Sequence, residues 1–83
     1  MTKDIIKAVV DKHDPEWLLR AGCPDDEYDP EIEMIFSRIR NDMTNQEIAE
    51  IIHAIFLQMF NDSLDAELCN IMACEMLAMT STS

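Results

Sequence analysis

The sequence predicts an all-α protein: a compact bundle of four main helices and one short helix, forming a single helical domain over residues 1–83. Three observations predict this fold class. Apolar residues make up 48% of the chain, which is enough for a core, but few are aromatic and there is a single glycine. This composition favours helices over strands joined by tight hairpins. Apolar residues also recur at helical spacing, and Asp-Pro pairs, which are typical of helix starts, occur twice.

The first expected helix runs from about Thr2 to Lys12 and carries its apolar residues on one side. A short helix is then expected to begin at Asp14-Pro15, because Asp is a favoured N-cap and Pro suits the first helical position. Gly22 is the kind of residue that follows a helix end, so it marks the end of this short helix.

The second Asp-Pro pair predicts the start of the next main helix, with Asp29 as its N-cap and Pro30 in its first turn. This helix is expected to run to about Asn41. Its expected apolar stripe consists of Ile32, Ile35, Phe36 and Ile39.

The helix from Asn45 to Phe60 is expected to be the central element, because apolar residues fill every position of the amphipathic template. Thr44 and Glu47 have the spacing of a capping box at its start. The stripe consists of Ile48, Ile51, Ile52, Ile55, Phe56, Met59 and Phe60.

The last helix is expected from about Leu64 to Met79, with Asp62 or Ser63 as its cap. Residues 79–83 are expected to be a frayed tail. All connections are short except the acidic one before Asp29, which favours antiparallel neighbours in a bundle.

The formal net charge is −11, and the acidic residues are unevenly placed. No base lies between Pro24 and Met34, and no Lys or Arg follows Arg40, although further acids do. The acids of the first segment are Asp25, Asp26, Glu27, Asp29, Glu31 and Glu33. A negative field of this kind repels nucleic-acid phosphate and anionic lipid and favours basic protein surfaces or cations. The alternative is that the acidity only keeps a small protein soluble.

The sequence carries no catalytic signature, and we expect no enzymatic activity, no cofactor and no metal. A calcium loop needs oxygen ligands at alternating positions and a Gly at its sharp turn, and residues 25–33 have no such pattern. His13 and His53 are not at metal-binding spacing from each other or from a cysteine, which argues against a zinc site.

The cysteines indicate a reduced protein. Cys69 and Cys74 are five residues apart, which places them on different sides of a helix and argues against a disulfide. They are expected to pack as small hydrophobic residues, whereas Cys23 lies beside acids that work against thiol reactivity. With no signal peptide and no stretch that could span a bilayer expected, the sequence predicts a cytoplasmic protein.

The acidic segment is the predicted contact surface for a partner. Asp25, Asp26 and Glu27 have no evident role in folding, and they lie beside Tyr28, an aromatic residue of the kind that anchors protein contacts. Glu31 follows in the first turn of the next helix and completes this candidate surface.

A second candidate surface is apolar. Met34 and Leu57 point away from the stripes of their helices and could form a patch with Met76 and Met79, or the methionines could simply fill the core. Glu75 lies among the apolar residues of the last helix. It is expected either to reach water or an Arg at the edge, or to be partly buried and position a neighbouring element.

The segment from Asp14 to Ile32 resembles the signature of a family of small all-α bacterial and phage proteins of unknown function. The shared features are an Asp-Pro, two apolar residues, a Pro, then Asp-Glu-Tyr-Asp and an Ile that starts a helix. Here Trp17 follows the Asp-Pro, whereas the family's Trp is expected just before it. Similar segments occur in proteins described as toxin-immunity proteins. The resemblance implies a helical fold and gives weight to residues 26–29, but it implies no activity.

Together these features predict a non-enzymatic acidic protein-binding module, an inhibitor or an immunity or anti-defence protein that neutralises a basic partner protein. Two alternatives stay open. One is a nucleic-acid mimic, whose carboxylates imitate phosphates in a DNA- or RNA-binding site of the partner. The other is a homo-oligomeric structural or regulatory subunit that pairs through Met34, Leu57 and the last helix. No direct contact with nucleic acid or membrane is expected.

Overall fold

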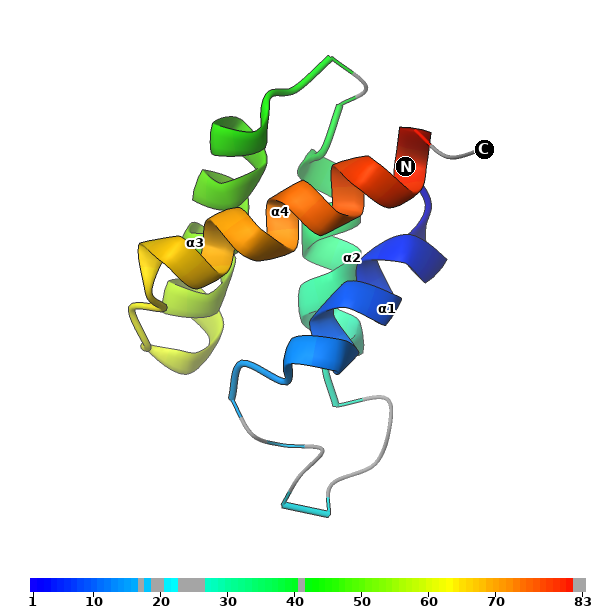
Figure 1. Ribbon diagram of the computed structural model, residues 1–83. Coiled ribbons are helices and arrows are strands. Elements are labelled where there is room, and N and C mark those ends of the chain that lie inside the picture. The colour runs from blue at the N-terminus through cyan, green and yellow to red at the C-terminus, as the bar shows by residue number, and fades with distance from the viewer. Residues whose placement is uncertain (17, 19–20, 23–26, 41, 82–83) are drawn as a thin grey trace.

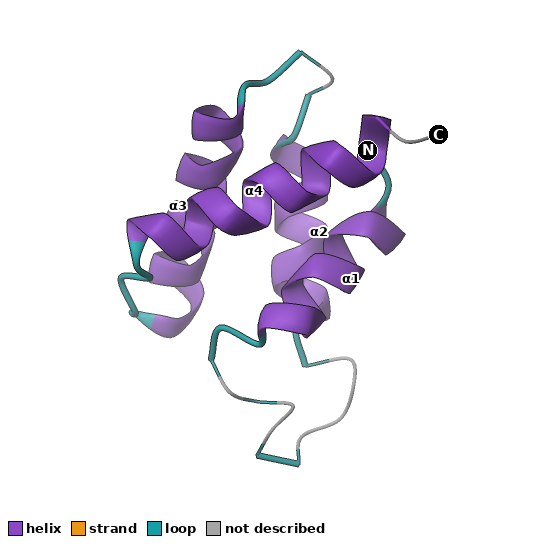
Figure 2. Ribbon diagram, viewed as in Figure 1, coloured by secondary structure: helices purple, strands orange, loops and turns teal. Residues whose placement is uncertain are grey.

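The computed structural model describes residues 1–16, 18, 21–22, 27–40 and 42–81, and within them it has four helices and no strand (Figure 1, Figure 2). The all-α prediction is therefore confirmed. The helices are α1 (Lys3–His13), α2 (Asp29–Arg38), α3 (Asn45–Phe60) and α4 (Ala66–Ser81).

Helix α3 begins at the predicted capping box. The Thr44 hydroxyl accepts a hydrogen bond from the Glu47 N–H at 3.2 Å, and the Glu47 carboxylate accepts one from the Thr44 N–H at 2.9 Å. At the other end, Asn61 has a φ of 53°, a left-handed conformation that ends a helix. Both predicted ends of this helix are confirmed.

The four helices pack in a closed ring. Helix α1 packs against α2 and α4, and α3 packs against the same two helices. Figure 1 shows α4 running from α3 across to α1. The arrangement leaves one face of α4 without a neighbouring helix among the described residues.

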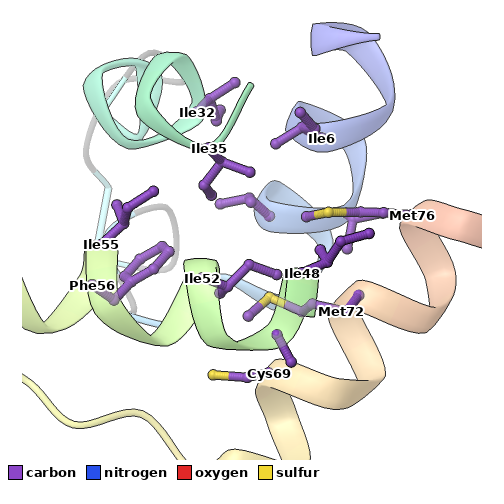
Figure 3. Close-up of a cluster of buried hydrophobic side chains, with 14 of the residues drawn as sticks. Ile6, Ile32, Ile35, Ile48, Ile52, Ile55, Phe56, Cys69, Met72 and Met76 are labelled. Carbon is purple, nitrogen blue, oxygen red and sulfur yellow. The ribbon is translucent and has the colours of Figure 1, made fainter. Parts of the chain in front are cut away.

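The core lies inside this ring, and α3 contributes more buried residues to it than any other helix. Ile52 and Phe56 are fully buried, and Figure 3 shows them among apolar side chains from the other helices. Those side chains include Ile6 of α1, Ile32 and Ile35 of α2, and Cys69, Met72 and Met76 of α4.

The expected short helix is not among the four. Asp14, its predicted N-cap, instead ends α1: its φ is 46° and its N–H donates to the Val10 carbonyl oxygen at 2.8 Å. Pro15 and Glu16 form a turn, and part of the expected helix, residues 17 and 19–20, lies outside the described residues.

The predicted ends of α2 are also corrected. The N-cap is Tyr28, without a side-chain hydrogen bond to the helix, and Asp29 lies in the first turn. The helix ends at Arg38, before the expected Asn41. Its outer residue Phe36 is 40% exposed, with the Lys3 ammonium over its ring, so it is not part of the core stripe.

Helix α4 starts and ends two residues later than expected. The residue that caps the first turn is Asp65, not Asp62 or Ser63. Its Oδ1 accepts a hydrogen bond from the Glu67 N–H at 3.3 Å. The helix continues to Ser81, with the Thr80 hydroxyl donating to the Met76 carbonyl oxygen, so the expected frayed tail does not begin at residue 79. None of the described helices has the length and apolar character required to cross a bilayer.

Candidate functional site

Tyr28, expected to anchor a partner contact, is instead fully buried. Its ring packs against Phe56 and Phe60 of α3, with ring centroids 6.1 and 6.4 Å away. In this conformation the side chain is inaccessible to a partner, and the aromatic residue that flanks the acidic segment belongs to the core.

The Tyr28 hydroxyl ties the acidic segment to the end of α1. It donates to the Asp14 Oδ1 at 2.7 Å and accepts from the Glu16 N–H at 2.9 Å. Burial, followed by the hydrogen bond to Asp14, raises the pKa of the tyrosine, so the phenol stays protonated and remains a donor. The residue therefore holds together two points of the chain that are 14 residues apart.

Glu31 is also buried, with 4% of its surface exposed. Burial, with a smaller contribution from the nearby charge of Glu27, raises its pKa, and its Oε2 has no hydrogen-bond partner among the described residues. This position, too, does not present a contact surface.

The other predicted contact residues differ from one another. Glu27 is exposed, whereas Asp25 and Asp26 lie outside the described residues. Met34 is half-buried against the core, and Leu57 is 43% exposed on α3. Met76 is fully buried in the core, so it cannot contribute to the apolar surface patch expected with Met34 and Leu57.

A pair of carboxyl groups connects the segment after α1 to the α3–α4 connection. The half-buried Glu16 carboxyl interacts with the exposed Asp62, and it can donate a hydrogen bond to Asp62 only when Glu16 is protonated. Burial, followed by the hydrogen bond to Asp62 and its charge, raises the pKa of Glu16 to about 7.

Charges of opposite sign are segregated in the described part of the chain. The ion pairs there all involve bases of α1, which contact Asp11 in the same helix, Glu33 of α2 and Glu75 of α4. Glu75 accepts from the Lys12 Nζ at 2.6 Å and contacts His13. These two hydrogen bonds, from Lys12 first and then His13, lower the pKa of Glu75. Glu75 is partly buried and pairs with Lys12 and His13 of α1, not with an Arg, so it has features of both roles expected for it.

The α3–α4 half of the molecule has acids only. Its described residues 42–81 include no Lys or Arg, and Glu75 is the one acid among them that forms an ion pair. The remaining acids are all exposed: Asp42, Glu47, Glu50, Asp62, Asp65 and Glu67. This half therefore presents unneutralised negative charge.

A groove of about 380 Å³ opens between the first halves of α3 and α4. Buried Ala49 and Cys69 form its floor, and exposed side chains form its rim. The α3 lining residues follow helical spacing at i, i+3, i+4 and i+7, and the α4 residues at i, i+3 and i+4. The lining consists of Gln46, Ala49, Glu50 and His53 of α3 and Ala66, Cys69 and Asn70 of α4.

One polar contact between the two helices and one between α3 and the α3–α4 connection border this groove. The Asn45 side chain donates to the Asn70 Oδ1 at 3.4 Å, and His53 Nε2 lies 3.1 Å from the Ser63 hydroxyl. Sequence reasoning missed the groove. The available signal was a row of polar residues along one side of α3 with a small residue, Ala49, among them. A larger side chain at that position would fill the groove.

His53 and Cys69 line the same groove, a combination that would matter for thiol chemistry. However, burial, with a smaller contribution from Asp65, raises the pKa of the Cys69 thiol to about 11. The thiol is therefore protonated at neutral pH and is a poor nucleophile. Cys69 and Cys74 are both free, and Cys69 packs in the core as expected, whereas Cys74 is exposed and does not pack as a core residue. No group of three or more potential metal-ligating side chains occurs within the described ranges.

Exposed apolar residues lie on α3 and α4, the helices that also carry three of the unneutralised acids, Glu47, Glu50 and Glu67. On α3, Leu57 and Met59 are 43% and 42% exposed, and on α4 Ile71 and Met79 are 43% and 42% exposed. On α4, the outward-facing Ile71, Cys74 and Ala78 are neither acidic nor basic. These surfaces combine apolar and acidic groups.

Comparison with protein-family models, with curated proteins and with solved structures gives no match to this chain.

Proposed function

We propose that this chain is a non-enzymatic binding module that neutralises a basic partner protein, in the manner of an inhibitor or an immunity or anti-defence protein. The observation that carries the proposal is the charge of the α3–α4 half, where six exposed acids, Asp42, Glu47, Glu50, Asp62, Asp65 and Glu67, have no basic partner among the described residues. Unpaired like charge opposes folding slightly, so a basic surface that pairs with it gains electrostatic energy on binding.

The expected mechanism separates encounter from contact. The net charge of −11 steers a basic protein toward the chain at long range, and this effect weakens as salt shortens the screening length. At short range, exposed apolar residues such as Leu57 and Ile71 supply area that can be removed from water. Binding then covers the functional surface of the partner, and no chemical step is required of this chain.

Nucleic-acid mimicry is the second candidate. A phosphate mimic needs carboxylates in rows at regular spacing, and the outer face of α3 supports this only in its first half. After Glu47 and Glu50, the exposed positions are Ala54, Leu57, Gln58 and Met59. The mixture of acids and apolar side chains favours a protein surface of mixed character as the partner.

A homo-oligomeric subunit is the third candidate. The buried Met76 and half-buried Met34 reduce the methionine surface through which copies were expected to pair. A second copy also brings a further charge of −11, which opposes association. Sedimentation at several concentrations separates this candidate from the first two.

The proposal is tested by capture from a host lysate on the immobilised chain at low salt, followed by elution at high salt. The expected result is one or a few basic proteins that are released by salt and then bind the purified chain in solution. Retained proteins that are acidic, or that salt does not release, would contradict the proposal.

Two triple variants with the same change in charge show which acids make the contact. The first variant carries Asp25→Asn, Asp26→Asn and Glu27→Gln, and the second variant carries Glu50→Gln, Asp65→Asn and Glu67→Gln. The second variant is expected to associate with the captured protein about tenfold more slowly at low salt, a typical loss for steered association. Association that neither variant changes would argue that the acidity only solvates the protein.

A further inference from the structure

The groove between α3 and α4 has the form of a site for one long side chain. Its volume of about 380 Å³ lies at the lower end of the range for small-molecule sites. The buried floor of Ala49 and Cys69 is apolar, and the exposed rim is polar. A ligand with an aliphatic stem and a polar head fits this groove, because the stem can lie on the apolar floor and the head at the polar rim.

The negative charge of the groove favours a ligand whose polar head is a cation. Glu50 is the acid of the lining, and neither Lys nor Arg lines it. None of the ion pairs in the described residues involves Glu50, so its carboxylate is available to an incoming cation. An anionic ligand would meet Glu50 directly and would find neither a Lys nor an Arg in the lining, whose one other titratable nitrogen group is the His53 imidazole.

The rim also contains two side-chain amides that can accept hydrogen bonds. Gln46 lies one helical turn before Glu50 on α3, and Asn70 faces them from α4. A guanidinium has five N–H donors in a fixed plane, so it can pair with the carboxylate and still donate to an amide oxygen. A lysine ammonium offers a more compact charge with three donors and matches this spread of acceptors less well.

We infer that this groove receives an arginine side chain of the partner, with the aliphatic stem over Ala49 and Cys69 and the guanidinium paired with Glu50. The inference rests on the proposed function, since it supplies the specific anchor by which a basic protein is held. Arginine is also among the residues that contribute most to protein interfaces when they enter a pocket.

The experiment titrates the isotopically labelled full chain with N-acetyl-arginine amide and follows backbone amide signals by NMR. Shifts are expected to concentrate in residues 46–53 and 66–70. Glu50→Gln should weaken binding about tenfold, as expected for the loss of one charged hydrogen-bond partner. Glu67→Gln makes the same change in charge outside the groove lining and should leave affinity within about twofold.

Three further measurements test shape and chemistry. Ala66→Leu narrows the groove without changing its charge and should also weaken binding about tenfold, because the exposed first residue of α4 tolerates the larger side chain. N-acetyl-citrulline amide, which has the shape of arginine without its charge, should cause no shifts at the same concentrations. N-acetyl-lysine amide should bind more weakly than the arginine probe.

Several results would overturn the inference: shifts spread over the acids of all helices, equal losses of affinity for Glu50→Gln and Glu67→Gln, unchanged binding by Ala66→Leu, binding of the citrulline probe, or equal binding of the lysine probe.

Failure of the arginine site can be distinguished from failure of the proposed function. If Glu50→Gln still binds a basic partner in a salt-sensitive way and as tightly as the wild type, the anchor is wrong and the binding function stands. If the arginine probe occupies the groove but no basic protein is captured, the proposed function is wrong.

Discussion

Tyr28→Phe removes one oxygen atom from the contact that ties the acidic segment to the end of α1. The phenylalanine ring keeps its packing against Phe56 and Phe60, so no cavity forms. What is lost is the donor to Asp14 at 2.7 Å and the acceptor of the Glu16 N–H at 2.9 Å. The variant therefore isolates the polar part of the contact from its apolar part.

The expected loss of stability is about 2–3 kcal/mol. A hydrogen bond to a charged group contributes about 1.5–3 kcal/mol, and here Asp14, 2% exposed, loses that donor while the Glu16 N–H loses its acceptor. A domain of this size has a free energy of unfolding on the order of 5–10 kcal/mol, so the loss should clearly lower the urea concentration at the midpoint of unfolding.

The assay is urea unfolding followed by far-ultraviolet circular dichroism, with the slope of the transition compared between variants. Asp14→Asn tests the same contact from its other side, and Asn tolerates the left-handed conformation of this position. The double variant should lose at least about 1 kcal/mol less than the sum of the single losses. A loss below about 0.5 kcal/mol for Tyr28→Phe, or additive losses in the double variant, would refute the role assigned to this contact.

Three other predictions concern the core, a shared proton and an ion pair. Ile52→Ala should cost about 2–5 kcal/mol in denaturant unfolding, because it opens a cavity in a fully buried position, whereas Phe36→Ala, at 40% exposure, should cost less than about 1.5 kcal/mol; similar losses would contradict the assignment of the core. The free energy of unfolding should fall by about 1–2 kcal/mol as the pH rises from about 4.5 to about 7, since burial and Asp62 raise the Glu16 pKa to about 7 and only the folded chain holds that proton. Glu16→Gln should flatten this part of the stability–pH curve, and an unchanged curve would speak against the shared proton. Glu75→Gln should lower the free energy of unfolding by about 0.5–1 kcal/mol at neutral pH. Because pairing lowers the pKa of this carboxyl, the difference in stability from wild type should disappear as the pH falls through that lowered pKa. A difference in stability that persists in acid would mean that Glu75 acts through packing.

The parts of the fold that sequence reasoning predicted correctly are those fixed by local interactions. Helix α3 has a capping box at one end and an apolar stripe, and both depend on residues a few positions apart. Met59 is the exception in the expected stripe, since it is 42% exposed and lies outside the core. The α4 cap shows the limit of this reasoning. Several acids and a serine near its start are all suitable N-caps, and the choice of Asp65 depends on where α4 must lie against α3.

The Asp-Pro signals show how one local pattern can have two outcomes. At Asp14 the pattern follows a completed helix, and the left-handed conformation together with the hydrogen bond to Val10 ends α1. At Asp29 it does lie at a helix start, but one position later than a capping residue. The difference comes from Tyr28, whose burial sets the position of the chain as it enters α2.

The candidate site was harder to predict because it depends on contacts distant in sequence. Tyr28 is surrounded by acids in the sequence, which indicated exposure, yet its partners are Asp14 and the α3 aromatic residues. The groove likewise requires the crossing of α3 and α4, which brings His53 and Cys69 to one surface. The excess of acids after Arg40 was visible in the sequence, and the structure adds the surface on which they lie.

The hydrogen bond between Tyr28 and Asp14 also determines how much the intervening segment can vary. It fixes the two ends of that segment near each other, independently of what lies between them. For a chain with fixed ends, doubling the number of residues costs only about 0.6 kcal/mol in closure entropy. Insertions between Gly22 and Glu27 are therefore expected to leave the helical bundle folded. The sequence between Gly22 and Glu27 could in this way be lengthened or exchanged between variants, and the bundle would serve as a stable support for a replaceable segment.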